Sequence, residues 1–173
     1  MKKSILFFLL LACTSGLFAQ GTPSIIPLPK TFQEKNESFV LDANVTIHFN
    51  DPLLADEAHF LQGKIFDDKG FVLPVGKELK EKNIALILKK DNEPQGGYRL
   101  TMSSQSIQIE SGSEEGLFNG IISLMQLSQF SSSDAIPCWD IKDVPKHEWR
   151  GVMLDESRHF FGKEKVKSLL DWM

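Results

Sequence analysis

The sequence predicts an α+β fold, an antiparallel sheet with packed helices, followed by a truncated start of a (β/α)8 barrel. Between residues 25 and 129, runs of alternating apolar and polar residues predict strands, and two stretches with apolar residues at helical spacing predict helices. Near the C-terminus, a short apolar run turns charged and leads into an amphipathic stretch, as one strand and helix of a barrel would. The 173 residues are too few for a whole barrel, which needs ~250 residues.

Residues 1–19 are predicted to be an export signal. Two lysines precede the apolar run 5–12, which is too short to cross a bilayer because a membrane-spanning helix takes ~20 residues. Two processing routes are open: cleavage after Ala19, which makes Gln20 the first mature residue, or a lipobox that ends at Cys13 and makes it a lipid anchor. Either route predicts an exported protein that is periplasmic, extracellular or lipid-anchored.

Charge and cysteine content exclude several classes of partner. The formal net charge is −4, and it becomes −6 once the two lysines of the signal are removed. No cluster of Lys or Arg occurs, so nucleic acid is not an expected partner, because proteins that bind it carry basic patches. Cys138 is alone after cleavage at Ala19, which excludes an internal disulfide, and we expect it to be a small buried residue. No histidine lies near it in sequence, so neither zinc binding nor thiol catalysis is indicated.

The α+β domain is assigned to residues 20–145. Strands are predicted at residues 45–49, 83–88, 98–102 and 107–109, the last two forming a hairpin. Asp51 and Pro52 predict the start of a helix, within which Gly63 is a stop or a weak point. A second helix is predicted to begin at 111–115 and to end near 131–134. Residues 137–145 are interpreted as a short bridge to the next domain.

Residues 146–173 are predicted to be the first strand and helix of the barrel. Val152 and Leu154 lie in a nearly continuous apolar run, which is typical of a parallel strand covered on both faces. Helix signals begin at Lys163, and the apolar stripe that follows consists of Val166, Leu169, Leu170 and Met173. No capping residue follows this stripe, so we expect a helix that is cut rather than finished.

The stretch from Gly151 to Phe160 (GVMLDESRHF) resembles the start of the catalytic barrel in family 20 glycoside hydrolases, the β-N-acetylhexosaminidases. Three upstream stretches agree. Residues 26–29 (IPLP) are similar to the N-terminal lead-in of that family, and residues 97–100 (GYRL) and 116–120 (GLFNG) are similar to the hairpin and helix of its accessory domain. The resemblance covers nearly the whole chain after the signal, and the barrel motif is its most specific part.

The resemblance implies an enzyme that removes terminal N-acetylglucosamine or N-acetylgalactosamine from glycans with retention of configuration. In this family the nucleophile is the substrate's own 2-acetamido carbonyl, so these enzymes are an exception to the scheme with two catalytic carboxylates. The resemblance also implies an adjacent Asp-Glu pair on a later strand. Its Glu is the general acid/base, and its Asp orients the acetamide group and stabilises the charge that develops there. No metal or cofactor takes part. That pair corresponds to positions beyond Met173, so the chain as given is expected to be inactive.

Arg158 is the candidate substrate-binding residue. The resemblance implies that it binds hydroxyls 3 and 4 of the terminal sugar, and a guanidinium offers several donors in a fixed plane. A salt bridge at the end of the strand, for instance with Asp155, is the alternative interpretation. Asp155 is expected to support Arg158 at the barrel rim, and Glu156 to be variable. This Asp-Glu doublet is not expected to be the catalytic pair, because neighbours on a strand point to opposite faces.

Two functions therefore compete. In the first, the chain is the N-terminal part of an exported β-N-acetylhexosaminidase whose partner is a glycan with terminal N-acetylhexosamine. In the second, it is a non-catalytic α+β module that binds a glycan or a protein partner, with the C-terminal segment as a docking tail. A guanidinium beside a carboxylate within the motif favours the first, because a docking tail has no need of that pair.

Overall fold

The structure is a computed structural model that describes residues 21–89, 94–131, 134–147 and 149–172. The predicted signal with Cys13 and the cleavage site after Ala19 lie outside the described residues, as does Met173. In the described part of the chain, no helix has both the length and the apolar character that crossing a membrane requires.

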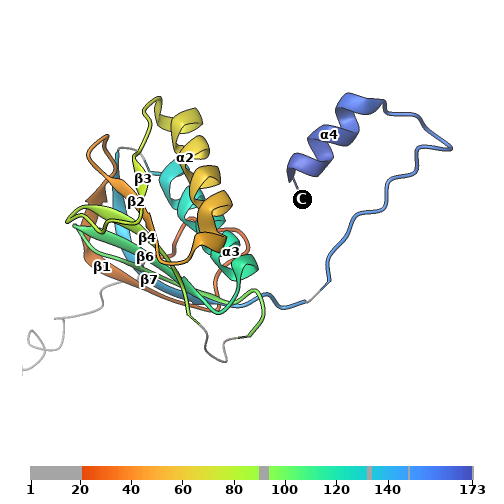
Figure 1. Cartoon of the computed structure of the whole chain (residues 1–173). Helices are drawn as coiled ribbons and strands as arrows, with labels where there is room; N and C mark the ends of the chain where they lie inside the picture. The colour runs from red at the N-terminus through yellow and green to blue at the C-terminus, as the bar shows by residue number, and fades with distance from the viewer. Residues whose placement is uncertain (1–20, 90–93, 132–133, 148, 173) are drawn as a thin grey trace, which may run out of the picture.

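One sheet of seven strands forms the body of the described domain (Figure 1). Its spatial order is β1-β7-β5-β6-β4-β2-β3. The strands are β1 (Thr31–Val40), β2 (Thr46–Phe49), β3 (Val75–Gly76), β4 (Asn83–Leu88), β5 (Tyr98–Met102), β6 (Ser106–Ser111) and β7 (Ala135–Asp143).

Two long helices, α2 (Ala55–Lys69) and α3 (Glu114–Gln129), pack together on one face of this sheet. A single 3-10 turn, η1 (Pro52–Leu54), precedes α2. A third helix, α4 (Lys163–Trp172), lies apart from the sheet at the end of an extended segment (Figure 1). The predicted α+β class, with helices packed on a sheet, is confirmed.

The sheet is mixed rather than antiparallel throughout. Strands β1, β7, β5 and β6 pair antiparallel, whereas β4 runs parallel to both β6 and β2, and β2 runs parallel to β3. The predicted hairpin of β5 and β6 is confirmed, with Met102 opposite Ile107. The parallel half arises because the chain leaves β2 through α2, and such a helical crossover returns the next strand in the same direction.

Residues 137–145 are not a bridge, so that interpretation is wrong. They belong mostly to β7, which lies inside the sheet between β1 and β5, with Ile141 opposite both Phe32 and Leu100. Strand β1, at the edge of the sheet, was not predicted either. Polar residues such as Asp140 face solvent from β7 while Ile141 is fully buried, as expected of a strand with one covered face.

The ends of α2 and α3 follow their capping residues. The Asp51 carboxylate accepts a hydrogen bond from Leu53 N at 3.0 Å, and Pro52 follows it, so the predicted start is confirmed at the 3-10 turn. Gly63 neither stops nor visibly weakens α2, which continues to Lys69 and ends at Gly70 with a left-handed φ of 78°. Ser113 caps α3 by accepting from Gly116 N at 3.1 Å.

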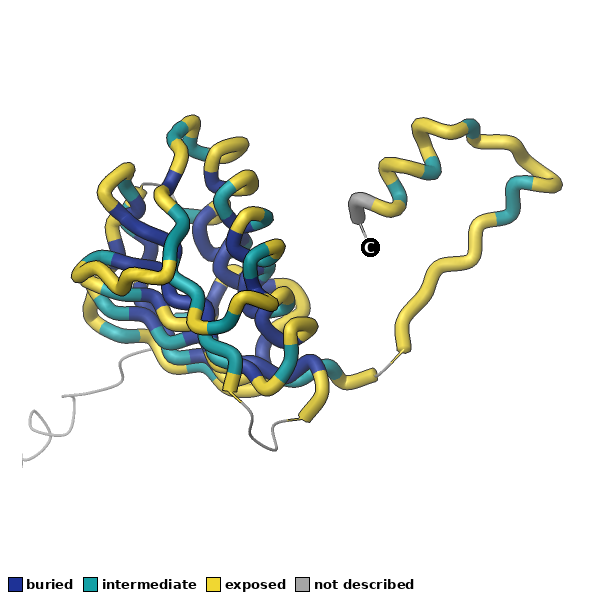
Figure 2. The backbone as a smooth tube through the Cα atoms, viewed as in Figure 1, coloured by how far each residue is buried: buried dark blue, intermediate teal, exposed yellow. Residues whose placement is uncertain are grey.

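The core lies between the sheet and the two helices (Figure 2). Helix α3 approaches the hairpin closely at Gly116 and Gly120, where an added Cβ would collide with Gly97 O and with the Ile109 side chain. The Tyr98 hydroxyl meets Ser123 Oγ at 2.6 Å in this core, and burial raises the pKa of Tyr98 to about 12. Cys138 is buried as expected, and burial raises the pKa of its thiol.

Candidate functional site

Arg158 and Asp155 lie in one tight turn between residues 155 and 159. The Asp155 carboxylate accepts hydrogen bonds from Ser157 N at 3.0 Å and from Arg158 N at 3.1 Å, and its other oxygen pairs with Arg158 Nε. The two side chains predicted to act together are thus brought together. The pairing fits both interpretations of Arg158, because a support for sugar binding and a plain salt bridge share this contact.

The pairing leaves most of the guanidinium available. Its Nε is used by Asp155, while the Arg158 side chain is 87% exposed. The two terminal nitrogens carry four N–H donors in one plane, which suits two neighbouring acceptor oxygens. The turn therefore holds the arginine through Nε and leaves the two terminal nitrogens of the guanidinium exposed.

The electrostatics of the turn keep Asp155 charged. Hydrogen bonds from the backbone and the side chain of Arg158 hold the pKa of the Asp155 carboxyl below its ordinary value, and Ser157 N adds to this. An ionised Asp155 is the form that accepts three hydrogen bonds at once. The pair therefore stays intact at neutral pH and weakens only in acid.

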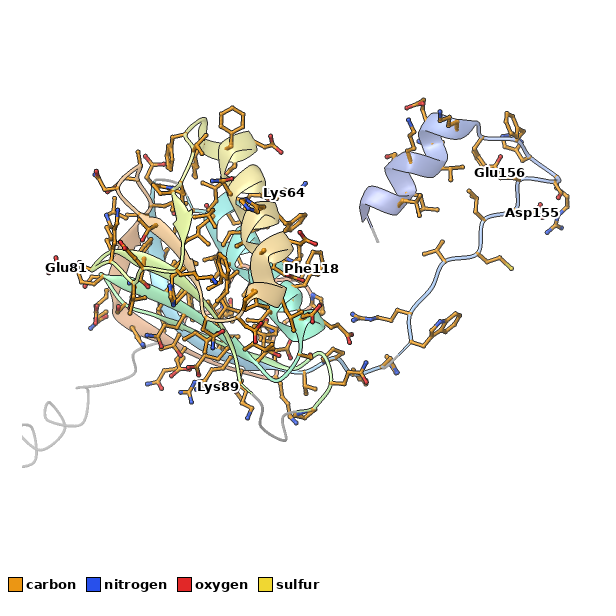
Figure 3. All side chains as sticks on the ribbon, in the orientation of Figure 1. Lys64, Glu81, Lys89, Phe118, Asp155 and Glu156 are labelled. Atoms are coloured by element: carbon orange, nitrogen blue, oxygen red, sulfur yellow. The ribbon has the colours of Figure 1, made fainter. Side chains whose placement is uncertain are left out.

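Glu156 and His159 complete the turn by local contacts. Glu156 lies next to Asp155 in this turn (Figure 3), and one of its carboxylate oxygens accepts a hydrogen bond from Phe161 N at 3.1 Å. The His159 ring packs edge-on against the Phe161 ring, with 4.6 Å between the ring centroids. Glu156 thus fastens the chain just before α4 begins. Sequence reasoning expected Glu156 to be variable and did not predict this contact.

The barrel strand predicted to contain Val152 and Leu154 is not formed. Residues 151–155 have no regular structure, and Val152 and Leu154 are exposed rather than covered on two faces. A parallel strand needs hydrogen-bonding neighbours, and no described strand lies beside this segment. The predicted helix is confirmed as α4, with Val166 and Leu169 half-buried along its apolar stripe.

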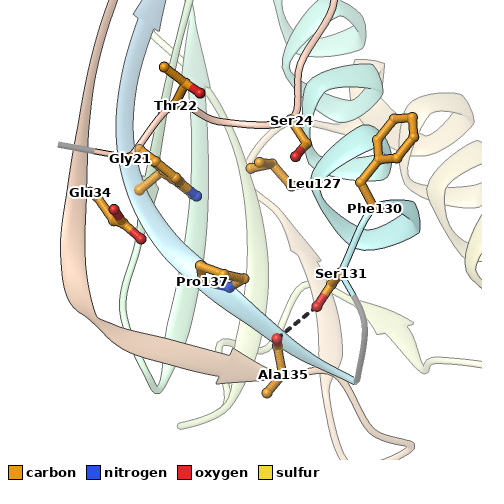
Figure 4. Close-up of a pocket in the computed structure, with 10 residues that line it drawn as sticks. Gly21, Thr22, Ser24, Glu34, Leu127, Phe130, Ser131, Ala135 and Pro137 are labelled. Atoms are coloured by element: carbon orange, nitrogen blue, oxygen red, sulfur yellow. Dashed lines mark hydrogen bonds between the residues drawn. The ribbon is translucent and has the colours of Figure 1, made fainter. Parts of the chain in front are cut away.

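A separate cavity of about 300 Å3 lies in the sheet domain between β1, β7 and the end of α3 (Figure 4). Trp139 is nearly fully buried in its wall, and Glu34 supplies the one acidic side chain of the lining. Ser131 closes one end by donating to Ala135 O at 2.9 Å. This cavity could not be predicted from the sequence, because the residues that line it come from four stretches that lie far apart in the chain.

No metal centre is formed by the part of the chain that the structure describes. Nowhere in it do three His, Cys, Asp or Glu side chains come together in a way that could hold an ion. What the Asp155–Arg158 turn offers chemically is hydrogen-bond donation to oxygen ligands.

Two family models match this chain, one after the other. Residues 22–144 match the description "Glycosyl hydrolase family 20, domain 2", and residues 147–173 match "Glycosyl hydrolase family 20, catalytic domain". The first covers the whole sheet domain, and the second covers the Asp155–Arg158 turn and α4. The border between the matches falls beside the predicted domain boundary at residue 145.

Curated relatives that are similar to this chain are named beta-hexosaminidases. A beta-hexosaminidase of Porphyromonas gingivalis is 32% identical over 166 residues, which are 87% of this chain and 21% of that protein. A beta-hexosaminidase of Akkermansia muciniphila is 38% identical over 78 residues, or 44% of this chain and 16% of that protein. The chain thus spans about a fifth of the length of these relatives.

Solved structures agree with the sequence matches. The exo β-N-acetylglucosaminidase of Vibrio harveyi, in complex with N-acetylglucosamine, is 27% identical with a TM-score of 0.75 over 91% of this chain and 25% of its own. The N-acetyl-β-hexosaminidase of Streptomyces plicatus, in complex with Thio-NAglucal, is 26% identical with a TM-score of 0.73 over 87% of this chain and 32% of its own.

Proposed function

Because the chain belongs to glycosyl hydrolase family 20, we propose that it is the N-terminal part of an exported β-N-acetylhexosaminidase. In this proposal the sheet domain is the accessory domain, and residues 146–173 begin the catalytic barrel. The observation that carries the proposal is the succession of the two family matches along one chain, in the same order as the folded domain and the arginine turn.

The proposed substrate is a glycan that ends in N-acetylglucosamine or N-acetylgalactosamine. Two similar proteins support this substrate class, one by its bound ligand and the other by its name. The Vibrio harveyi structure holds N-acetylglucosamine, and a curated relative from the same organism, 32% identical over 45% of this chain, is named N,N'-diacetylchitobiase. The reaction is retaining hydrolysis in which the substrate's acetamido oxygen attacks the anomeric carbon.

Arg158 is proposed to bind two neighbouring hydroxyls of the terminal sugar. Asp155 fixes the guanidinium through Nε and through the Arg158 backbone, which leaves the terminal nitrogens to donate. Hydrogen bonds from a charged donor each contribute about 1.5–3 kcal/mol. In the folded barrel, residues 152–154 would pair as a strand and place this turn at the carboxyl end, where barrels carry their sites.

Residues 1–173 on their own are proposed to be inactive. The chain has two Asp-Glu doublets, at 56–57 and 155–156. The first lies in the opening turn of α2, and in the second Asp155 is engaged with Arg158 and Glu156 with Phe161 N. Neither doublet is the acid/base pair in this proposal, which assigns that pair to a later strand of the barrel, and such a group contributes about 10²–10⁴-fold to the rate.

The test of this function measures hydrolysis of an aryl N-acetyl-β-glucosaminide and of the matching aryl β-glucoside. Two proteins are compared: the 173-residue chain, and the barrel-containing protein, meaning this sequence continued after Met173 by the rest of a barrel. Turnover of only the N-acetylated substrate by only the longer protein supports the proposal. Turnover by the short chain, or equal turnover of both substrates, contradicts it, and binding without turnover by the longer protein favours the non-catalytic module.

Export is proposed as well, on the sequence of residues 1–19. Mass spectrometry of the protein from its own cells identifies the mature N-terminus. A chain that begins at Gln20 supports cleavage after Ala19, and a lipid-modified Cys13 supports the anchor. An intact Met1 in a cytoplasmic fraction contradicts both routes.

A further inference from the structure

The cavity between β1, β7 and the end of α3 is lined by polar side chains that the fold itself does not use. They are Thr22 and Ser24 of the N-terminal segment and Glu34 of β1 (Figure 4). Within the described part of the chain, none of these three side chains has a hydrogen-bond partner. Two hydroxyls, which donate and accept, and one carboxylate, which accepts, are therefore available to a ligand.

The wall of the same cavity adds a donor and an apolar surface. Trp139 of β7 is only 4% exposed, yet its indole N–H has no hydrogen-bond partner among the residues that the structure describes. A buried indole N–H usually has one. The nitrogen is not fully enclosed, and Trp139 lines the cavity, so a ligand there can supply the acceptor. Leu127, Phe130 and Pro137 line the cavity with apolar groups.

Two contacts hold the N-terminal segment beside the cavity. The Gln126 side chain of α3 clamps the backbone of Ile26, accepting from Ile26 N at 2.7 Å and donating to Ile26 O at 3.3 Å. Gly21 lies so close to the wall that an added Cβ would collide with the Glu34 carboxylate and lie 3.5 Å from Trp139 Cη2. The cavity is thus formed before a ligand arrives, which reduces the entropy that binding costs.

The size and chemistry of the cavity fit one sugar ring. Sites for small molecules are concave and mostly apolar with a few polar groups, and they measure about 300–1,000 Å3. This cavity, at about 300 Å3, is at the lower end of that range. A pyranose has hydroxyls around its edge and C–H groups on its two faces, which match a carboxylate and an indole donor beside apolar walls. No described Lys, Arg or His side chain lines the cavity, so an anionic ligand would be repelled by Glu34.

We propose that this cavity binds one neutral pyranose residue of a glycan, with Glu34 accepting from two neighbouring hydroxyls and Trp139 Nε1 donating to a third oxygen. The inference rests on the proposed function only for the choice of a glycan as the source of the sugar. It goes further by placing a second glycan contact on the sheet domain, outside the catalytic barrel.

The cavity lies away from the point where the chain leaves the sheet domain. After β7, Pro145 lies against Gly96, and Asn119 in the first turns of α3 donates to Gly96 O at 2.9 Å. The cavity is at the other end of this helix, where Phe130 lines it. At about 1.5 Å per residue, the rise from Asn119 to Phe130 is about 16 Å. A glycan held in the cavity would therefore have a second attachment, which raises the effective concentration of its remaining units near the protein.

The test titrates the 173-residue chain with N-acetylglucosamine and follows the assigned indole N–H signal of Trp139 by NMR. We expect a saturable shift with a dissociation constant of about 1 mM, as for a small ligand with few contacts. Glu34→Gln keeps the shape of the side chain but removes its charge, and it should weaken binding about tenfold or more. Glu37→Gln is the matched control, because Glu37 lies on the same strand but does not line the cavity, and it should leave the affinity unchanged.

An unmoved Trp139 signal would overturn the proposal, as would equal affinities for Glu34→Gln and the unaltered chain or an equal loss in Glu37→Gln. Glucosamine, which carries an ammonium group, is titrated in parallel. A shift with glucosamine but none with N-acetylglucosamine would indicate a cation site and would also overturn the proposal. The outcome is independent of catalysis. Binding at Trp139 without hydrolysis of N-acetylglucosaminides by the barrel-containing protein would retain the cavity site and lose the proposed function, and hydrolysis without this binding would do the reverse.

Discussion

The sheet domain and the segment after residue 146 contain the same kinds of apolar residue, but these residues are buried in the sheet and mostly exposed in the segment. In the sheet, Ile84 of β4 and Leu100 of β5 are fully buried, whereas Val152 and Met153 are exposed in a segment with no regular structure. Both regions have strand-forming sequences. A strand therefore forms where neighbouring strands supply its backbone hydrogen bonds, as β2 and β6 do on either side of β4.

The largest expected effect comes from deleting matched leucines in the two regions. Leu100→Ala removes a fully buried side chain from the centre of the sheet, and should lower the free energy of unfolding by about 2–5 kcal/mol. Leu154→Ala in the 173-residue chain should change the free energy of unfolding by less than about 0.5 kcal/mol, because that side chain is exposed and packs against little. Urea unfolding followed by circular dichroism measures both values. Similar losses from the two variants would contradict the contrast.

Alkaline pH should destabilise the sheet domain through Tyr98. Its pKa is about 12 in the folded state against 10.0 unfolded, so the folded state holds the proton more tightly. The stabilisation is complete below pH 10 and is lost as pH rises from 10 to 12, by about 2–3 kcal/mol in all. Unfolding measured across this range should show a smaller loss for Tyr98→Phe. The same pH slope in that variant would exclude Tyr98 as the cause.

Two glycines should respond with opposite sign to the same substitution. Gly116→Ala places a methyl group against Gly97 O in the hairpin, so backbone must move, at a cost of about 1–3 kcal/mol. Gly63→Ala meets nothing within 4 Å on the exposed side of α2 and should stabilise by about 0.5–1 kcal/mol. Melting temperatures of the two variants give the signs directly. A Gly116→Ala variant that melts at the same temperature as the unaltered protein, or higher, would refute the close packing of α3.

The sequence predicted what depends on local signals. Asp51 and Ser113 as helix starts, the β5–β6 hairpin and the stripe of α4 were all recognisable, because their causes lie within a few residues. Strand β7 was mistaken for a bridge because polar Asp140 and Lys142 interrupt its apolar residues. Its burial comes from partners in β1 and β5 that no local pattern reveals.

The candidate site was predictable in part, from a family-like motif and not from local folding signals. The GVMLDESRHF motif directed attention to Arg158 and Asp155, and the structure joins them in one turn. The contact of Glu156 with Phe161 N, and the clamp of Gln126 on Ile26, could not be predicted. Both use side chains of ordinary composition, and in the second case 100 residues separate the partners.

The smallest expected effect is local to the arginine turn. The Asp155 carboxyl should titrate below its ordinary pKa, because hydrogen bonds from Arg158 and Ser157 favour its charged form. Carbon NMR of the Asp155 side chain across pH 2–6 follows this titration, and Arg158→Ala should raise its midpoint. An unchanged midpoint in that variant would show that the turn does not hold in solution. Overall stability should be unaffected, since both side chains lie in the exposed segment.

Measuring kcat/KM of Arg158→Lys in the barrel-containing protein tests whether the terminal nitrogens of Arg158 bind the terminal sugar. Lysine keeps the charge but loses the planar pair of donors. Arg150→Lys, at an exposed position of the same segment, is the matched control. We expect kcat/KM for an aryl N-acetyl-β-glucosaminide to fall about 10- to 100-fold for Arg158→Lys and to stay unchanged for Arg150→Lys. Equal kcat/KM for Arg158→Lys and the unaltered protein would contradict the claim.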